Sequence, residues 1–211
     1  MLITALFLSV LASLTLSAAA NSCKDRPLSD EEKYIILKWH NELRNEVASG
    51  EYKGQEPAKN MRELVWSEEL ASKAKEWAEN CQPDGHDEIL TELGMGQNLG
   101  SWGSEDEEVT DEVFQAVLVS IMDAWASEVD KFEGTSKNAG HYTQVIWART
   151  SEIGCETFRS KENDINWINL VCDYKTAGNT GRKRPYRRGE PACEKYKMEQ
   201  SPTYTNLCVQ V

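Results

Sequence analysis

The chain has 211 residues, which is enough for one domain with a well-buried core and a small appendage. Its formal net charge of -12 disfavours contact with polyanions. The composition therefore argues against a general role in binding nucleic acid or anionic lipid, and we expect no nucleic-acid partner.

The first segment, residues 1–20, has no charged side chain, is mostly apolar over residues 2–16 and ends in three alanines. Small residues at that place suit a signal peptidase, so we predict a signal peptide that is cleaved before Asn21. A membrane anchor is the alternative, but the apolar run is shorter than the about 20 residues that span a bilayer. The sequence thus predicts a secreted, extracellular protein without a transmembrane segment.

The six cysteines all follow the predicted cleavage point. An even number in an exported chain favours disulfide bonds. Zinc ligation is the alternative, but the sequence has no CxxC pair and no finger-like spacing. Six cysteines allow about fifteen connectivities, so the residues alone leave the pairing open. The cysteines are Cys23, Cys81, Cys155, Cys172, Cys193 and Cys208.

Three helices are predicted from their start signals and apolar periodicity. The first follows Ser29, which is spaced to form a capping box with Glu32, and it ends at Gly50. The second starts at Ser67. The third covers residues 110–129, where an apolar stripe runs as far as a tryptophan.

The loop between the second and third helices, residues 84–108, is rich in glycine and acidic residues. We expect much of it to be irregular or to form short extended pieces.

Two strands are predicted after the helices, over residues 153–159 and 167–174, joined by a polar turn at 161–164. Each strand contains one cysteine, and Cys155 can face Cys172 across such a hairpin. Helices followed by a hairpin indicate a mixed, layered α+β domain.

The composition changes again near residue 180, where we place a domain boundary. Residues 182–188 form a basic run that is a candidate heparin-type patch or dibasic processing site, although a solvated basic linker is the interpretation we favour. The rest of the extension, residues 181–211, has little apolar material, so we expect a disulfide to fasten it.

The three histidines are His40, His86 and His141. A lone histidine is most often a hydrogen-bonded structural residue. His86, however, lies in the glycine-rich loop, and His141 lies in the segment GHYTQVIWART, where polar and aromatic residues are mixed too densely for a simple amphipathic helix. Glu128 follows the apolar stripe of the third helix, where an acidic side chain can turn inward.

The segment GHYTQVIWART resembles the signature of the CAP superfamily, which comprises cysteine-rich secretory proteins, antigen 5 venom allergens and plant pathogenesis-related proteins. Five further segments follow in the order typical of that family, and together they cover residues 29–179 with most similarity to the antigen 5 branch. These segments are HNELR at 40–44, NMRELVW at 60–66, WAENC at 77–81, GQNL at 96–99 and CDYKTAGN at 172–179.

The resemblance implies an α-β-α sandwich with a central antiparallel sheet over residues 21–180, followed by the short C-terminal extension. It also implies three disulfides. Cys155 would pair with Cys172, Cys23 with Cys81, and the remaining Cys193 with Cys208.

The family has a cleft lined by two histidines and two acidic residues. By motif position these map to His86, His141 and Glu128, while the fourth position falls on Gln97. The two imidazoles and the carboxylate are therefore the candidate metal ligands, as a site for a divalent cation such as zinc. Because a neutral amide is a poor zinc ligand, we expect Gln97 to make zinc binding weak. We expect that no cofactor is required. Protons compete for imidazole nitrogens, so any such binding should weaken as pH falls.

One further departure from the family pattern is Asp173, where relatives have Asn or Gln, and there we expect only local changes at a turn. The resemblance implies a non-catalytic, secreted binding protein of venom, saliva or defence. Its partner would be an extracellular protein or a small lipid, and a lipid would lie between the first and third helices. The alternative to a lipid site is that the apolar faces of these two helices pack together as ordinary core. A metal-assisted hydrolase or protease ranks lower, because the motifs offer no serine or cysteine nucleophile.

Overall fold

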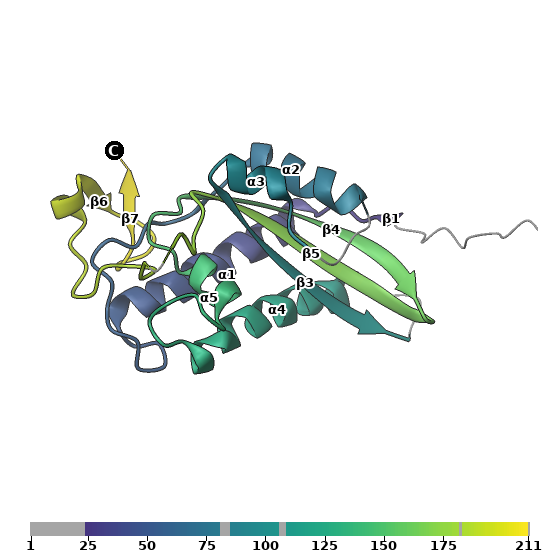
Figure 1. The fold of residues 1–211 in the computed structure, drawn as a ribbon, viewed down its shortest axis with the longest axis horizontal. Coiled ribbons are helices and arrows are strands. Elements are labelled where there is room, and N and C mark those ends of the chain that lie inside the picture. Colours follow the sequence, from purple (N-terminus) through teal and green to yellow (C-terminus); the bar gives the residue numbers. More distant parts are fainter. Residues whose placement is uncertain (1–23, 81–84, 106–108, 182, 211) are drawn as a thin grey trace, which may run out of the picture.

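The computed structural model describes residues 24–80, 85–105, 109–181 and 183–210. The predicted signal peptide and the predicted pair Cys23–Cys81 lie outside these residues. Helices α2 (Glu68–Glu79) and α3 (Glu88–Glu92) cover one face of a central sheet, while α1 (Asp30–Ser49), α4 (Asp111–Ser127) and α5 (Gly140–Val145) lie on the other face (Figure 1). The predicted α-β-α sandwich is thereby confirmed.

The five-stranded sheet has the order β1-β4-β5-β3, from Lys24–Asp25 through Glu152–Glu162 and Ile165–Lys175 to Met95–Ser104. These neighbours are all antiparallel. The short strand β2 (Val65–Trp66) pairs in parallel with β4 and is the exception.

The predicted helix starts are confirmed. Ser29 and Glu32 form the capping box of α1, and Gly50 ends that helix in the left-handed region at φ 84°. The side chain of Ser67 caps α2. Thr110 caps α4, whose last residues continue into a 3-10 helix, η1 (Glu128–Lys131).

The expectation for residues 84–108 was wrong in part, because this segment contains α3 and the ten-residue strand β3, which pairs with β5 along its whole length. Glycine lowers strand propensity, which hid the strand. In the structure these glycines allow helices to approach the sheet. A Cβ atom on Gly96 would lie 2.1 Å from Oε1 of Gln144, and one on Gly100 would lie 2.3 Å from Cγ2 of Ile121.

The predicted hairpin is present, and its strands β4 and β5 are longer than expected. The turn lies at Asn163 and Asp164, both in the left-handed region with φ of 50° and 64°. Cys155 and Cys172 are directly opposed in the register and form a disulfide, as the sequence suggested.

The HNELR segment of α1 is structural. His40 lies fully buried, with Nδ1 at 2.8 Å from the carbonyl oxygen of Ile36 and Nε2 at 2.9 Å from the hydroxyl of Tyr174. Burial lowers the pKa of this imidazole to about 4, so it is neutral near pH 7. Asn41 binds both main-chain groups of Leu64 through its side-chain amide.

Arg44 is a buried cation, and within the described part of the chain its guanidinium donates hydrogen bonds only to carbonyl oxygens. Burial lowers its pKa to about 9. The guanidinium holds the chain between α5 and β4 against α1. The acceptors are the main-chain oxygens of Arg62, Val145, Trp147 and Thr150.

The C-terminal extension contains a 3-10 helix, η2 (Cys193–Tyr196), and the strand pair β6 (Met198–Gln200) and β7 (Cys208–Gln210). The expected disulfide Cys193–Cys208 is present. The extension is also attached through the core, because Tyr186 and Leu207 are buried in the main apolar cluster. Within the described ranges, no helix combines the length and hydropathy needed to cross a bilayer.

Candidate functional site

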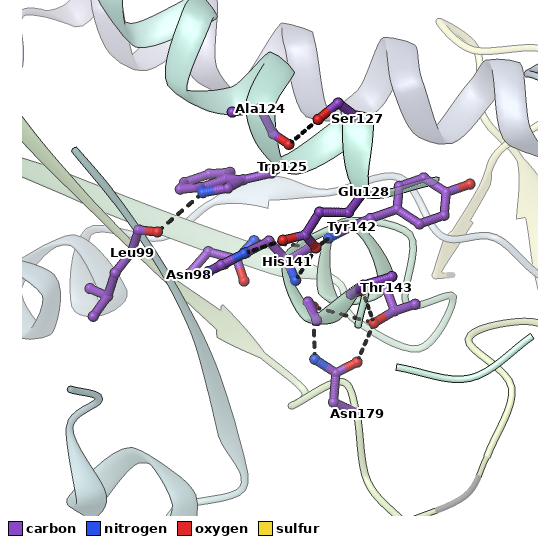
Figure 2. A network of polar contacts seen from close by, with 12 residues as sticks. Asn98, Leu99, Ala124, Trp125, Ser127, Glu128, His141, Tyr142, Thr143 and Asn179 are labelled. Atoms are coloured by element: carbon purple, nitrogen blue, oxygen red, sulfur yellow. Dashed lines mark hydrogen bonds and ion pairs between the residues drawn. The ribbon is translucent and has the colours of Figure 1, made fainter. Parts of the chain in front are cut away.

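Glu128 and His141 form the centre of a polar network at the junction of α4 and α5 (Figure 2). One carboxylate oxygen, Oε2, accepts the main-chain N–H groups of His141 at 2.9 Å and Tyr142 at 3.1 Å. The other, Oε1, lies 2.7 Å from Nδ1 of His141. Ala139 precedes α5 and offers no side-chain cap, so Glu128 supplies the acceptor that the helix start requires.

The imidazole of His141 is held between α4 and β3. Trp125 stacks on it with ring centroids 6.0 Å apart and an angle of 17° between the planes. The indole N–H of Trp125 donates to the carbonyl oxygen of Leu99 at 3.1 Å, which orients the indole (Figure 2). Asn98 donates to the main-chain oxygen of His141 at 3.2 Å. His141 therefore has little freedom to rotate, although its side chain is 37% exposed.

The other side chains of the GHYTQVIWART segment anchor α5. Oγ1 of Thr143 lies 2.6 Å from Oδ1 of Asn179, and Asn179 donates to the carbonyl oxygen of Gly140 at 2.9 Å. Gln144 accepts the N–H of Gly178 at 2.7 Å. These contacts join α5 to the chain that follows β5.

His86 and Gln97 form a second network on the α3 side of the sheet. Nδ1 of the exposed His86 lies 3.2 Å from Oε1 of Gln97, and the same oxygen accepts the N–H of Asp87 at 3.1 Å. The amide nitrogen of Gln97 donates to Oδ1 of Asp173 at 2.9 Å. Gln97 and Asp173 are direct partners in the β3–β5 register.

Asp173 is a buried carboxyl group that the sequence interpretation placed at a turn. It lies inside β5 with 0% of its surface exposed, and among the described residues its Oδ2 has no hydrogen-bond partner. Burial raises the pKa of this carboxyl to about 7, against the smaller lowering effect of the Gln97 hydrogen bond. A single acidic residue inside the run NLVCDYK was the available signal.

The four predicted cleft residues are thus arranged as two pairs, Glu128 with His141 and His86 with Gln97. Successive side chains of a strand point to opposite faces, so Asn98 contacts the α5 side while Gln97 contacts Asp173 on the other. Between the two pairs, the described side chains form no hydrogen bond or ion pair.

The predicted ligand set is not assembled as a group in the structure. Within the part of the chain that the structure describes, no three His, Cys, Asp or Glu side chains are placed to hold one metal ion. Both oxygens of Glu128 are already occupied by hydrogens of α5. Each histidine, in contrast, uses Nδ1 for a side-chain contact. A neutral imidazole that donates from Nδ1 carries its lone pair on Nε2, the arrangement of a metal-binding histidine with an orienting partner.

Comparison with known proteins gives a consistent result. A family model described as the cysteine-rich secretory protein family (CAP) matches residues 37–174. Venom allergen 5 of Vespa mandarinia is 41% identical over 180 residues, covering 80% of this chain and 86% of that protein. Salivary antigen-5 of Dipetalogaster maximus is 35% identical over 210 residues, covering 92% and 84%.

Solved structures match over most of the chain. The structure of NaASP2 with Zn²⁺ is 27% identical, with a TM-score of 0.70, and covers 89% of this chain and 100% of that one. The structure of BmVAL-1, at 24% identity and a TM-score of 0.71, covers 87% and 96% and has the same fold.

Proposed function

The chain belongs to the cysteine-rich secretory protein (CAP) family, and we propose that it is a secreted, non-catalytic binding protein whose cleft histidines hold a divalent cation such as zinc. Export is supported by the signal-like residues 1–20, by two disulfides and by relatives named for venom and saliva.

The observation that carries the metal proposal is that both histidines use Nδ1 to contact an oxygen acceptor. Nδ1 of His141 is directed at a carboxylate and Nδ1 of His86 at an amide oxygen. Both contacts leave Nε2 as the nitrogen that would bind zinc. Glu128 and Gln97 then act as orienting partners and not as ligands. When bound, the ion would act as a Lewis acid with open positions for water or an extracellular donor atom.

A hydrolytic function has less support. A general base needs a free acceptor oxygen or nitrogen beside its substrate, and both oxygens of Glu128 already accept hydrogen bonds from α5. The hydroxyl of Thr143 contacts Asn179 and the carbonyl oxygen of Ala139, so it is not paired with a base.

A lipid channel between α1 and α4 also has less support than a cation site. The apolar stripes of both helices lie in one buried core cluster, with Ile36 and Val47 of α1 alongside Phe114 and Leu118 of α4. Outside that cluster, Trp39 of α1 donates to Asp123 of α4 at 2.9 Å. A lipid between these helices would have to displace packed side chains.

Isothermal titration with zinc chloride tests the proposal, with excess calcium chloride present so that surface carboxylates are occupied by a hard cation. We expect His86→Ala and His141→Ala each to weaken zinc binding by about tenfold or more. Identical isotherms for the wild type and the His86→Ala/His141→Ala double variant would disprove the metal site. Zinc-dependent release of a peptide or ester product would disprove the non-catalytic assignment.

A further inference from the structure

The C-terminal extension and the domain body together form an open cavity of about 760 Å³. It lies away from the cleft histidines and is formed by four separate parts of the chain. Lys59 and Asn60 line it from the segment before β2, and Trp147 and Arg149 from the segment before β4. Residues 183–188 and Tyr196 supply the remaining wall. Its volume falls within the about 300–1,000 Å³ typical of small-molecule sites.

The cavity is strongly cationic in a protein of net charge -12. Among the described residues, no acidic side chain lines it. Arg188 forms an ion pair with Glu56, while in the described ranges the other five basic residues have no carboxylate partner. Cations grouped in this way around a concave surface concentrate the positive field where an anion would enter. The basic residues of the lining are Lys59, Arg149, Lys183, Arg184, Arg187 and Arg188.

The basic wall, residues 183–188, is hydrogen-bonded to the domain body. It is therefore not the solvated linker that we favoured from the sequence. The carbonyl oxygen of Arg187 accepts a hydrogen bond from the N–H of Lys59 at 2.8 Å. The main-chain N–H of Arg187 donates to the side chain of Asn60 at 3.0 Å. One residue earlier, the Tyr186 hydroxyl donates to the carbonyl oxygen of Glu56 at 3.0 Å. Because its main chain is hydrogen-bonded to Lys59 and Asn60, the wall presents its cations from a preformed surface.

Aromatic side chains complete the lining. Trp147, Tyr186 and Tyr196 all contribute to it, and the guanidinium of Arg187 lies 5.8 Å from the ring centroid of Tyr196. Trp147 and Tyr186 are largely buried, so Tyr196 offers most of the aromatic surface to a planar group bound there. The cavity therefore combines contacts for charged oxygens with contacts for a ring.

We propose that this cavity binds a small organic polyphosphate, a molecule with at least two phosphate groups attached to a ring system, such as a nucleoside triphosphate. Guanidinium and ammonium groups match the tetrahedral oxyanions of phosphate, and the aromatic wall accommodates the ring. Sulfate esters share the same oxyanion chemistry. The cavity is open on one side, but its cations are grouped around a single hollow of about 760 Å³, which suits a compact ligand better than a long sulfated glycan.

The test uses the full secreted chain and isothermal titration in EDTA, in about 150 mM NaCl so that distant charge attraction is screened. The probes are ATP, inorganic tripolyphosphate and a heparin dodecasaccharide. The pocket variant is Arg149→Glu/Lys183→Glu. The matched control, Lys38→Glu/Lys75→Glu, changes the net charge equally at residues on α1 and α2 that do not line the cavity.

We expect one ATP per chain, bound more tightly than tripolyphosphate, with affinity reduced about tenfold or more in the pocket variant and nearly unchanged in the control. Tyr196→Ala should weaken ATP several-fold and leave tripolyphosphate unaffected, because only ATP carries a ring. Arg149 and Lys183 are exposed, so unchanged thermal unfolding midpoints should accompany these losses.

Three results would overturn the proposal. The first is the absence of ATP binding. The second is an equal loss in the control variant, which would indicate a general charge effect. The third is tighter binding of heparin than of ATP with the same sensitivity to the pocket variant, which would assign the surface to a sulfated glycan.

Discussion

Glu128 accepts hydrogen bonds from both the side chain and the main chain of His141. The imidazole Nδ1 lies at 2.7 Å and the main-chain N–H at 2.9 Å. The same carboxylate therefore starts a helix and orients a ring. This double role links the stability of α5 to the direction in which Nε2 of His141 points.

The first prediction concerns that carboxylate. Glu128→Ala should lower the free energy of unfolding by about 1–3 kcal/mol, because two main-chain N–H groups and one imidazole lose their acceptor. Urea unfolding followed by fluorescence measures the change. Glu133→Ala, in the exposed loop nearby, is the control and should alter stability by less than about 0.5 kcal/mol. Equal effects of the two substitutions would contradict the capping role.

The second prediction concerns the contact between Gln97 and Asp173. Gln97→Glu alone would place two carboxylates at hydrogen-bond distance, where they cannot both ionise. In Gln97→Glu/Asp173→Asn the new amide can donate to the new carboxylate, which then accepts from His86. We expect this double variant to bind zinc about tenfold more tightly than the wild type and the single variant to gain less. An equal gain in the two variants, measured by titration, would show that Asp173 does not matter.

The third prediction is a pH dependence of stability. The pKa of Asp173 rises from 3.8 in the unfolded chain to about 7 in the folded protein, so the folded state keeps a proton that the unfolded chain releases. Its contribution to the free energy of unfolding therefore falls as pH rises from about 4 to about 7, by at most about 1.4 kcal/mol per unit, and is constant above. Asp173→Asn should be relatively more stable at pH 8 than at pH 5.

The buried His40 changes the free energy of unfolding with pH in the opposite direction, so the measurement must separate the two contributions. Its pKa falls from 6.5 to about 4 on folding, so its contribution rises with pH between those values. The informative quantity is the difference between the wild type and Asp173→Asn at each pH, in which the His40 contribution cancels. A difference that does not vary with pH would contradict the assignment.

The fourth prediction concerns Arg44. Arg44→Met should reduce the free energy of unfolding by about 3–5 kcal/mol, because four buried carbonyl oxygens lose their donors. Lys38→Met on the same helix is the control, because the pair that Lys38 forms with Glu42 is exposed to solvent and should contribute little to stability. Urea denaturation measures both. A loss below about 1 kcal/mol would mean that water replaces the guanidinium without cost.

The fifth prediction tests whether the C-terminal extension is part of the folding unit. Leu207 is fully buried in the main core, so Leu207→Ala should cost about 2–4 kcal/mol. Val209, two residues further on, is only partly buried, and Val209→Ala should cost much less. If the two costs are equal and small, residues 21–180 form the stable domain by themselves and the extension is an appendage.

The sequence predicts most helix ends and the hairpin because those signals are local. Ser29, Ser67 and Gly50 act on neighbouring main-chain groups, and the alternation around Cys155 and Cys172 is read within a few residues. Strand β3 was missed because its glycines are explained by Gln144 and Ile121, which are distant in sequence. No local pattern reports such a close approach.

For the candidate site, too, the sequence predicted some features and missed others. The motif positions assigned His86, Gln97, Glu128 and His141 to one cleft, and in the structure they are in contact as two pairs. That the four residues form two networks could not be derived, since it depends on the face of the sheet to which Gln97 of β3 points. The buried state of Asp173 depends likewise on α2 packing over β5, which is a tertiary contact.

The attachment of the basic wall has a consequence for the resistance of the protein to proteases. Trypsin-like proteases cut after Arg or Lys only where several residues can leave the surface in an extended form. At Arg187 that would require breaking main-chain hydrogen bonds to Lys59 and, two residues on, to Pro57. Although its sequence resembles a processing site, the intact chain should resist cleavage after Arg187.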